Sequence, residues 1–195
     1  MPRLFTALEV PRSVALGLSL LKGGLPGARW IDPENYHITL RFVGDIDDRR
    51  ADDLAEALER IKAPGFALSV RGLSVFGSKN PHSLIANVEP SPALMTLQGD
   101  IDRLCQRLSM PGDPRRFTPH ITLARLKAAK AADVGRYLVE RGMVYVPDFV
   151  ATRFVLLSSR DSIGGGPYVI EADYPLSPLA PLQRPASALA ASDTI

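Results

Sequence analysis

The chain of 195 residues has a single cysteine and no long apolar run. With Cys105 alone, it can form neither an internal disulfide nor a cysteine-rich zinc site, and a reducing cytoplasm fits best. No segment approaches the ~20 apolar residues that span a bilayer. Residues 14–21 lack the flanks of a signal peptide. The sequence therefore predicts a cytoplasmic protein without a membrane anchor.

A strong net charge is also lacking. The formal charge is +2, far below that of chains that bind nucleic acid by bulk electrostatics. The composition, 46% hydrophobic and 23% charged, is that of a folded globular protein and too apolar for a disordered one. Any contact with RNA should therefore be local, at one mouth or groove.

Hydrophobic periodicity predicts strands that alternate with amphipathic helices. Strands are expected at residues 4–10, 36–44, 66–76, 83–88, 116–125, 144–158 and 168–174. Helices are expected after Pro11 and at residues 48–62, 94–108 and 131–141, while residues 25–35 read as turns. The hairpin signal at residues 77–81 and the single-helix spacers suit antiparallel or mixed sheets, so the fold class is α+β.

The ends of the chain differ in composition. Residues 1–176 carry the strand and helix patterns and are expected to form one domain. Residues 177–195 are rich in proline, alanine and serine and keep no amphipathic period. A disordered tail is the prediction for that segment.

The tetrapeptide HITL occurs twice, at residues 37–40 and at residues 120–123. Two of the three histidines of the chain therefore head the same motif. Because side chains alternate along a strand, histidine and threonine face one way and isoleucine and leucine the other. Side by side in related lobes, the two strands would bring two imidazoles and two hydroxyls together across a cleft.

Such a set supplies what cleavage of a phosphodiester needs. One neutral imidazole accepts a proton from the attacking oxygen, and one imidazolium protonates the leaving oxygen. The hydroxyls of Thr39 and Thr122 can bind the phosphate oxygens on which charge gathers. A purely structural role is the ordinary reading of a lone histidine, but an identical duplicate of His37 and His120 favours catalysis.

Two arginines lie near the ends of the motif strands, where a guanidinium could pair with a phosphate. Simple alternation places Arg41 on the face of His37, whereas Arg125 falls opposite His120 and needs a twist to reach the site. Arg115 and Arg116 could line the mouth, although solvated surface charge is the simpler reading.

Other chemistries find less support. A His-x-Thr pair offers one good metal ligand per strand and no carboxylate at matching spacing. No glycine-framed serine appears, and Cys105 falls beside a helical stripe and reads as core. Residues 164–166, three glycines, read as a turn, and His82 reads as an exposed loop residue.

With both motifs in place, the chain closely resembles the two-histidine phosphoesterases, specifically the bacterial and archaeal RNA 2′,3′-cyclic phosphodiesterases, also called 2′-5′ RNA ligases. The resemblance runs from about residue 3 to residue 176. Beyond the motifs, it rests on RLFTALEVP, LPGARWIDPENYHITLRFVGDI, GLSVFG, RRFTPHITLAR and the closing stretch from a tyrosine to Pro-Leu. His82 replaces a usually apolar position, and the tail lies outside the resemblance.

The resemblance implies a bilobal α+β fold of two similar halves, with the active-site cleft between their sheets. It implies His37 as proton donor, His120 as proton acceptor, and Thr39, Thr122 and Arg125 as phosphate binders. The implied reaction opens a terminal 2′,3′-cyclic phosphate to a 2′-phosphomonoester, with a related ligase activity and no metal or nucleotide cofactor. The expected partner is a cyclic-ended RNA, such as a tRNA fragment, bound by a monomer.

Two other functions stay open on the sequence. One is a binding module for RNA or nucleotides that has no catalytic activity, although intact histidines in both motifs argue against it. The other is a phosphodiesterase for small cyclic nucleotides or ADP-ribose cyclic phosphates, since the sequence does not fix the size of the leaving group.

Overall fold

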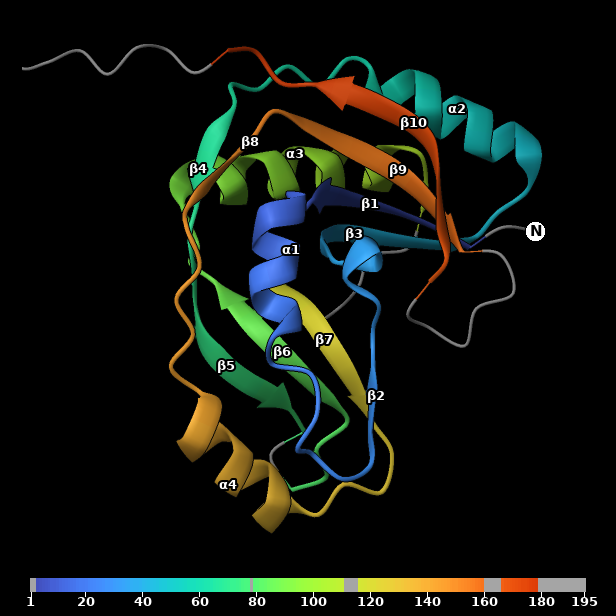
Figure 1. Ribbon diagram of the computed structural model, residues 1–195. Helices are drawn as coiled ribbons and strands as arrows, with labels where there is room; N and C mark the ends of the chain where they lie inside the picture. Colours follow the sequence, from blue (N-terminus) through green and yellow to red (C-terminus); the bar gives the residue numbers. More distant parts are fainter. Residues whose placement is uncertain (1–2, 78, 111–115, 160–165, 179–195) are drawn as a thin grey trace, which may run out of the picture.

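The computed structural model describes residues 3–77, 79–110, 116–159 and 166–178, drawn in colour in Figure 1. The helices are α1 (Arg12–Ser19), α2 (Asp48–Leu58), α3 (Pro92–Arg107) and α4 (Ala131–Arg141), with a short 3-10 helix, η1 (Pro33–Asn35). The strands are β1 (Arg3–Glu9), β2 (Ala28–Trp30), β3 (His37–Asp45), β4 (Phe66–Leu68), β5 (Val70–Phe76), β6 (Ser83–Val88), β7 (His120–Leu126), β8 (Phe149–Ala151), β9 (Arg153–Ser159) and β10 (Tyr168–Pro175).

Capping residues in the sequence explain where α2 and α3 begin. The side chain of Asp47 accepts a hydrogen bond from the backbone N–H of Arg50, which caps α2. Ser91 caps α3 in the same way through the N–H of Leu94, and Pro92 occupies the first turn. The predicted apolar stripe of α3 is buried, which confirms that this face points to the core.

Eight strands form one sheet in the order β10-β9-β1-β3-β7-β6-β5, with β2 also paired to β7. Every pairing between these strands is antiparallel, as it is between β4 and β8, which pair with each other. The predicted hairpin is formed by β5 and β6. The α+β class and the antiparallel sheet are therefore confirmed.

The chain repeats one sequence of elements. The N-terminal half, β1-α1-β3-α2-β4-β5, is followed by β6-α3-β7-α4-β8-β9 in the C-terminal half. In the sheet order, β3 and β7 are neighbours at the centre, β1 and β6 flank them, and β9 and β5 come next. Each half thus gives its last strand to the other half, and an approximate two-fold axis passes between β3 and β7.

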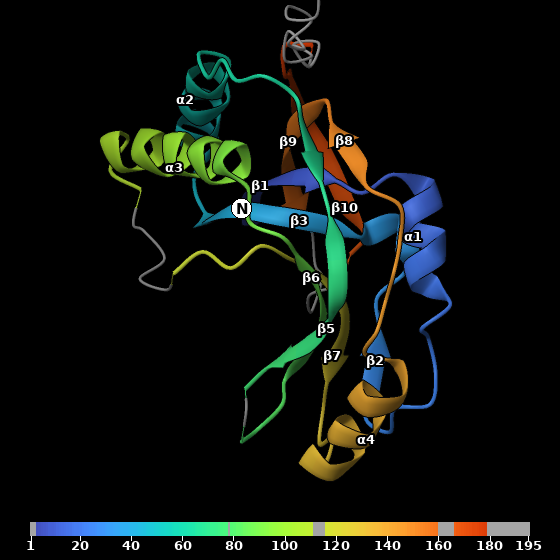
Figure 2. The same cartoon turned by 90° about the vertical axis from the view of Figure 1, so that its left-hand side faces the viewer.

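The two halves are not separate sheets, which differs from the expected cleft between sheets. Hydrogen bonding continues from β3 to β7, but only Ile38 and Ile121 are paired there. Figure 2 shows the two groups of strands diverging from this seam. The strands separate because each is tied over a longer register to its own neighbour, β1 or β6.

The helices pack against one large core. Contacts join α3 to β3 and to α2, and α4 to β5, so each group of strands is covered by helices. Figures 1 and 2 show α2 and α3 beside β1 and β3, and α4 beside the lower strands. The hydroxyl of Tyr137 in α4 donates to the carbonyl of Leu21, just after α1, at 2.6 Å. Among the described helices, none has both the length and the apolar character of a membrane span.

Most predicted boundaries hold within a few residues, and five differ. The strand expected from residue 116 begins only at His120. Residues 28–30, expected to be a turn, form β2 because they pair with the edge of β7. The expected strand 66–76 is split into β4 and β5, and the strand expected from residue 144 begins only at Phe149. The second helix ends at Leu58.

The predicted tail lies almost wholly outside the described residues. Ser177, however, is part of the fold, since its carbonyl accepts from the N–H of Gly65 at 2.7 Å and its own N–H donates to Ala63. The ordered chain therefore passes the predicted boundary at residue 176.

Candidate active site

The two HITL motifs lie next to each other at the centre of the sheet. The pairing of Ile38 with Ile121 sets the register of β3 and β7. Extended by one residue each way, this register places His37 across from Thr122 and Thr39 across from His120. The four polar side chains are half-buried, whereas both isoleucines are fully buried on the other face. The expected convergence of two imidazoles and two hydroxyls is confirmed in this form.

A bulge follows each motif and changes which side chains reach the site. The pairing of β3 with β1 skips Leu40, and that of β7 with β6 skips Leu123. An extra residue in one strand interrupts the alternation of faces. The burial pattern of both strands accordingly shows two buried residues in succession, after which the next side chain returns to the motif face.

The bulge brings Arg125 to the face of His120. It is half-buried, and its Nη1 donates to the hydroxyl of the fully buried Ser83 at 2.8 Å. Arg125 is also close enough to lower the pKa of His37 through its charge. Sequence alternation had left it on the wrong face, and the bulge is the physical reason that it reaches the site.

The corresponding bulge in β3, at Leu40, sends Arg41 to the opposite face, so the expectation that Arg41 shares the face of His37 is wrong. Its side chain is buried and forms an ion pair with Asp102 of α3. Nη2 also donates to the carbonyl of Met110 at 3.2 Å. Arg41 therefore ties β3 to the end of α3 and does not join the face that carries His37 and Thr39.

Both motif histidines are held by the same device. Nδ1 of His37 lies 2.8 Å from the carbonyl oxygen of Asn35, and Nδ1 of His120 lies 2.7 Å from that of Thr118. A carbonyl oxygen only accepts, so Nδ1 carries the proton in both rings. The other nitrogen, Nε2, is then the one that can exchange a proton at the site.

The surroundings of the two imidazoles differ. His37 contacts Phe5 and Tyr168, with ring centroids 5.0 Å apart in each case. Burial, opposed by the hydrogen bond to Asn35 and assisted by the charges of His120 and Arg125, lowers the pKa of His37 to about 4. The rings of His120 and Phe76 are nearly perpendicular, with centroids 4.8 Å apart. In the unliganded protein His37 is therefore neutral at neutral pH.

Sequence reasoning missed several residues of the site. Phe5, Tyr168 and Phe76 were not predicted to belong to the site, although Phe5 and Phe76 lie in stretches that carry the family resemblance, and Ser83 appeared only as the start of a strand. The one signal available was spacing: the accepting carbonyl belongs in both halves to the residue two positions before the histidine.

Four other expectations concern residues away from the motifs. Cys105 is fully buried in the core, as predicted. His82 is exposed, as predicted, and its ring stacks on Phe76 at 6.2 Å. Arg116 is exposed, while Arg115 and residues 164 and 165 lie outside the described residues.

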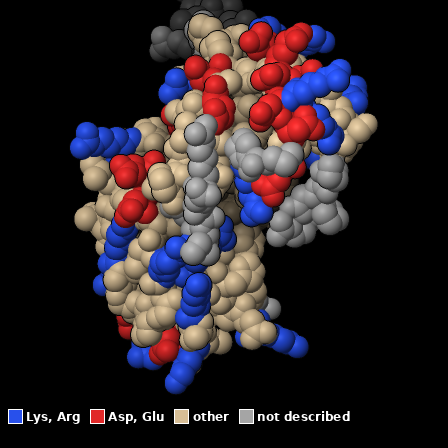
Figure 3. Space-filling view, turned by 90° about the vertical axis from the view of Figure 1, so that its right-hand side faces the viewer, with Lys and Arg blue, Asp and Glu red and all other residues tan. Residues whose placement is uncertain are grey.

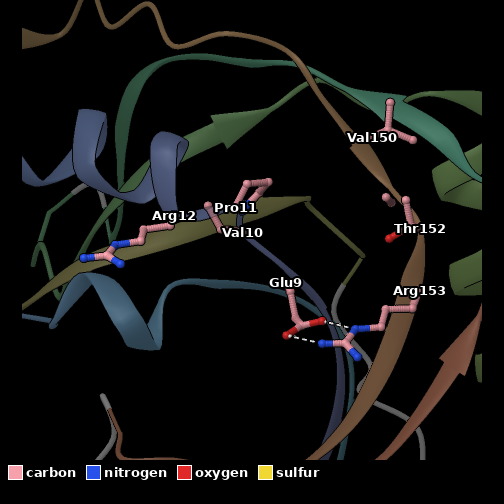
Figure 4. A pocket seen from close by; sticks show the side chains of 8 residues that line it. Glu9, Val10, Pro11, Arg12, Val150, Thr152 and Arg153 are labelled. Carbon is pink, nitrogen blue, oxygen red and sulfur yellow. Dashed lines mark hydrogen bonds and ion pairs between the residues drawn. The ribbon is translucent and has the colours of Figure 1, made fainter.

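A cavity of about 580 Å³ lies beside the site but does not contain it. It is lined by Glu9, Val10, Pro11, Arg12 and residues 150–153, without any motif side chain. Figure 4 shows that Glu9 and Arg153 form a two-bonded ion pair there, at 2.5 and 3.1 Å. Because Glu9 pairs with His37 across β1 and β3, the cavity borders the face of the sheet that carries both motifs. The motif side chains themselves lie outside the cavity.

Comparison with known proteins identifies the repeat. The sequence matches the family described as LigT like Phosphoesterase twice, over residues 8–86 and 85–168. The chain belongs to this family. The two matches coincide with the two halves of the fold, so the LigT-like unit is one half and each unit contributes one HITL motif.

Two relatives of this chain carry the same name. The RNA 2′,3′-cyclic phosphodiesterase of Geobacillus stearothermophilus is 38% identical over 62% of this chain, and the match covers 41% of that protein. The protein of the same name from Thermotoga maritima is 35% identical over 64% of this chain and 70% of its own length. The chain thus spans under half of the first relative.

Solved structures share the fold. Escherichia coli LigT complexed with 3′-AMP has a TM-score of 0.73 at 24% identity and covers 90% of this chain and 99% of its own. TT0787 of Thermus thermophilus has a TM-score of 0.74 at 24% identity, over 91% and 100%. The LigT fold is therefore shown over nearly the whole described chain.

Proposed function

We propose that this protein is an RNA 2′,3′-cyclic phosphodiesterase that opens the terminal cyclic phosphate to a 2′-phosphomonoester. The observation that carries the proposal is the pair of imidazoles, each fixed through Nδ1 to a carbonyl and each beside a threonine of the other strand. The names of the relatives support the same reaction.

Each side chain has a role in the displacement at phosphorus. Nε2 of His120 accepts a proton from water, whose oxygen attacks phosphorus. The bond from phosphorus to the 3′ oxygen breaks, and Nε2 of His37 protonates that oxygen. Thr39, Thr122 and Arg125 bind the non-bridging oxygens, where charge gathers in the transition state. With an RNA 5′-hydroxyl in place of water, the same steps join two ends, which is the ligase reaction.

Because the pKa of His37 is low, protonation of its imidazole depends on the binding of substrate. A proton donor must be protonated, yet burial keeps this imidazole neutral in the unliganded protein. A phosphate anion beside Nε2 favours the imidazolium and raises the pKa. His37 therefore gains its proton when the cyclic phosphate binds, in surroundings that the Phe5 and Tyr168 rings keep apolar.

Positive charge on the motif face suits an anionic substrate. Arg29 of β2 lies directly across from Arg125 of β7, so both guanidinium groups emerge on the same face. Figure 3 shows one side of the molecule, where Lys and Arg predominate in the lower part and Asp and Glu lie among further Lys and Arg in the upper part. The E. coli LigT structures with 3′-AMP, ATP and NADP+ are consistent with nucleotide binding here.

The test is turnover of a cyclic-ended oligonucleotide in EDTA, with the product isomer identified by phosphorus NMR. The proposal predicts full activity in the chelator and a 2′-phosphate as sole product, since acid, base and charge stabilisation all come from side chains. Loss of activity that a divalent ion restores would contradict the mechanism, and a 3′-phosphate product would contradict the assigned leaving group. Binding without turnover would show a recognition module.

A further inference from the structure

Each motif histidine has one polar neighbour on its outer side, which is the side away from the seam between β3 and β7. Glu9 of β1 pairs with His37, and Asn87 of β6 pairs with His120. Side chains directly across from each other in an antiparallel pair share one face, with Cβ atoms about 4.5–5.5 Å apart. The approximate two-fold axis thus relates an acid in the N-terminal half to an amide in the C-terminal half.

The carboxylate of Glu9, beside His37, is engaged in an ion pair. Its two oxygens accept from the guanidinium group of Arg153 at 2.5 and 3.1 Å, as Figure 4 shows. Arg153 also pairs with Asp173 at 3.4 Å. The outer side of His37 is therefore closed by a network of paired charges.

The amide of Asn87, beside His120, is held on one side only. Its Oδ1 accepts from the hydroxyl of Ser74 at 2.6 Å, which fixes the half-buried side chain on the motif face. No hydrogen bond within the described residues uses its Nδ2. Gly72 lies opposite, in a bulge of β5, and a Cβ at that position would be 3.9 Å from Nδ2. Because Gly72 has no side chain, the space beside the two N–H donors stays open.

The geometry of the displacement indicates what this space receives. The attacking and leaving oxygens lie roughly in line, on opposite sides of phosphorus. With the cyclic phosphate between the motif strands, the leaving oxygen lies beside His37 and the attacking oxygen beside His120. A molecule that replaces water must therefore extend outward over β6 and β5. In the ligase reaction that molecule is a nucleoside with a 5′-hydroxyl, and Asn87 lies directly beyond His120 on its path.

We infer that Asn87 binds the nucleoside whose 5′-hydroxyl attacks the cyclic phosphate, which rests on the proposed function. Nδ2 donates to a ribose oxygen of that nucleoside, while Ser74 holds the amide in place. The 5′ oxygen loses its proton to His120 and bonds to phosphorus, and the 3′ oxygen leaves with a proton from His37. Asn87 therefore favours attack by an RNA end over attack by water, and the C-terminal half contains the site for the second strand.

The experiment measures the ratio of ligation to hydrolysis when a cyclic-ended oligonucleotide reacts beside a 5′-hydroxyl oligonucleotide. Asn87→Ala should lower this ratio roughly three- to tenfold, the effect of losing one hydrogen bond. Ser74→Ala should lower it less, because the amide is retained but no longer held. Glu9→Gln is the matched control, since it changes the equivalent neighbour on the leaving-group side. Both reactions release the same 3′ oxygen, so this control should keep the wild-type ratio. An unchanged ratio in Asn87→Ala, or an equal fall in Glu9→Gln, would overturn the inference.

A binding measurement separates this inference from the proposed function. Titration calorimetry in the His37→Gln background, which keeps the ligand intact, compares adenylyl-(2′→5′)-adenosine with adenosine 2′-phosphate. Only the dinucleotide carries a second nucleoside, so Asn87→Ala should weaken its binding roughly three- to tenfold and leave that of the monophosphate unchanged. If wild-type protein opens no cyclic phosphate, the proposed function fails, yet this selective loss would still support the inference. The same measurement decides the inference if the protein hydrolyses without ligating. Equal affinities for the dinucleotide with and without Asn87→Ala would overturn it.

Discussion

The N-terminal and C-terminal halves hold the same motif in the same backbone. In each, the histidine opens a central strand, its Nδ1 contacts the carbonyl two residues earlier, and a bulge follows the threonine. The surroundings differ: His37 lies among Phe5 and Tyr168, while the C-terminal half adds Ser83 and Arg125. The repeat fixes the positions of the two histidines, and the different side chains around them are the basis for the acid, base and phosphate-binding roles that we propose.

The largest effect should come from removing either imidazole. His37→Ala and His120→Ala should each lower turnover by ~10²–10⁴-fold, the usual contribution of general acid or base catalysis. Thermal unfolding should change little, because both side chains are half-buried on an open face. His82→Ala, at an exposed position, is the control and should stay active. Near-normal turnover of either His37→Ala or His120→Ala would contradict the proposal that each half supplies one catalytic histidine.

The next effect separates two arginines that the sequence treats alike. Arg125→Gln should lower kcat/KM roughly 10–100-fold, because a charge-assisted hydrogen bond of about 1.5–3 kcal/mol is lost. Arg41→Gln should instead lower the free energy of unfolding by roughly 3 kcal/mol, since it breaks a buried ion pair with the partly exposed Asp102. Denaturant titration and steady-state kinetics separate the two. The reverse pattern would show that the faces were assigned wrongly.

A smaller, matched loss is expected at the two threonines. Thr39→Val and Thr122→Val keep shape but remove a hydroxyl, so each should cost about tenfold in kcat/KM. Thr6→Val is the control, because Oγ1 of Thr6 is buried and has no hydrogen-bond partner among the described residues. If neither threonine substitution changes kcat/KM, phosphate binds elsewhere. A large loss of kcat/KM in only one of the two variants would show that the halves bind phosphate unequally.

The smallest effect concerns stability and pH. The pKa of His37 is about 4 in the folded protein against an ordinary 6.5, so between these values the unfolded chain binds more protons. Stability should therefore fall as pH decreases from about 6.5 to about 4, by at most about 3 kcal/mol from this group. His37→Asn, which can still donate to Asn35, should lose that part of the pH dependence. The free energy of unfolding is measured by urea titration at several pH values in this range. If it depends on pH in His37→Asn as it does in the wild type, the burial of a neutral imidazole is contradicted.

The sequence carried much of the fold because its signals were local. The stripe of α3, the caps at Asp47 and Ser91, and the alternation within each HITL strand all act over a few residues. The duplicated motif predicted for the same reason that the two histidines would lie on neighbouring strands. Alternation also placed Thr39 and Thr122 correctly, since both precede the bulge.

What failed depends on pairing between distant strands. A bulge adds one residue to a strand relative to its partner strand, so the sequence of residues 37–45 or 120–126 alone does not predict it. The sequence therefore could not show that Arg41 lies on the face opposite the motif histidines and Arg125 on the same face. Residues 28–30 become a strand because the edge of β7 offers hydrogen bonds, despite the turn-forming residues around them. The aromatic surroundings of His37 come from β1 and β10, which are far apart in the sequence.

The proposed roles of His37 as acid and His120 as base can be tested by comparing two substrates. A 2′,3′-cyclic phosphate with sulfur at the 3′ position releases a thiolate, which leaves without a proton from His37. We expect this substrate to restore much of the activity of His37→Gln relative to the oxygen substrate, while His120→Gln stays impaired because water must still be deprotonated. Equal rescue of both variants, or rescue of His120→Gln alone, would contradict the assignment of His37 as acid and His120 as base.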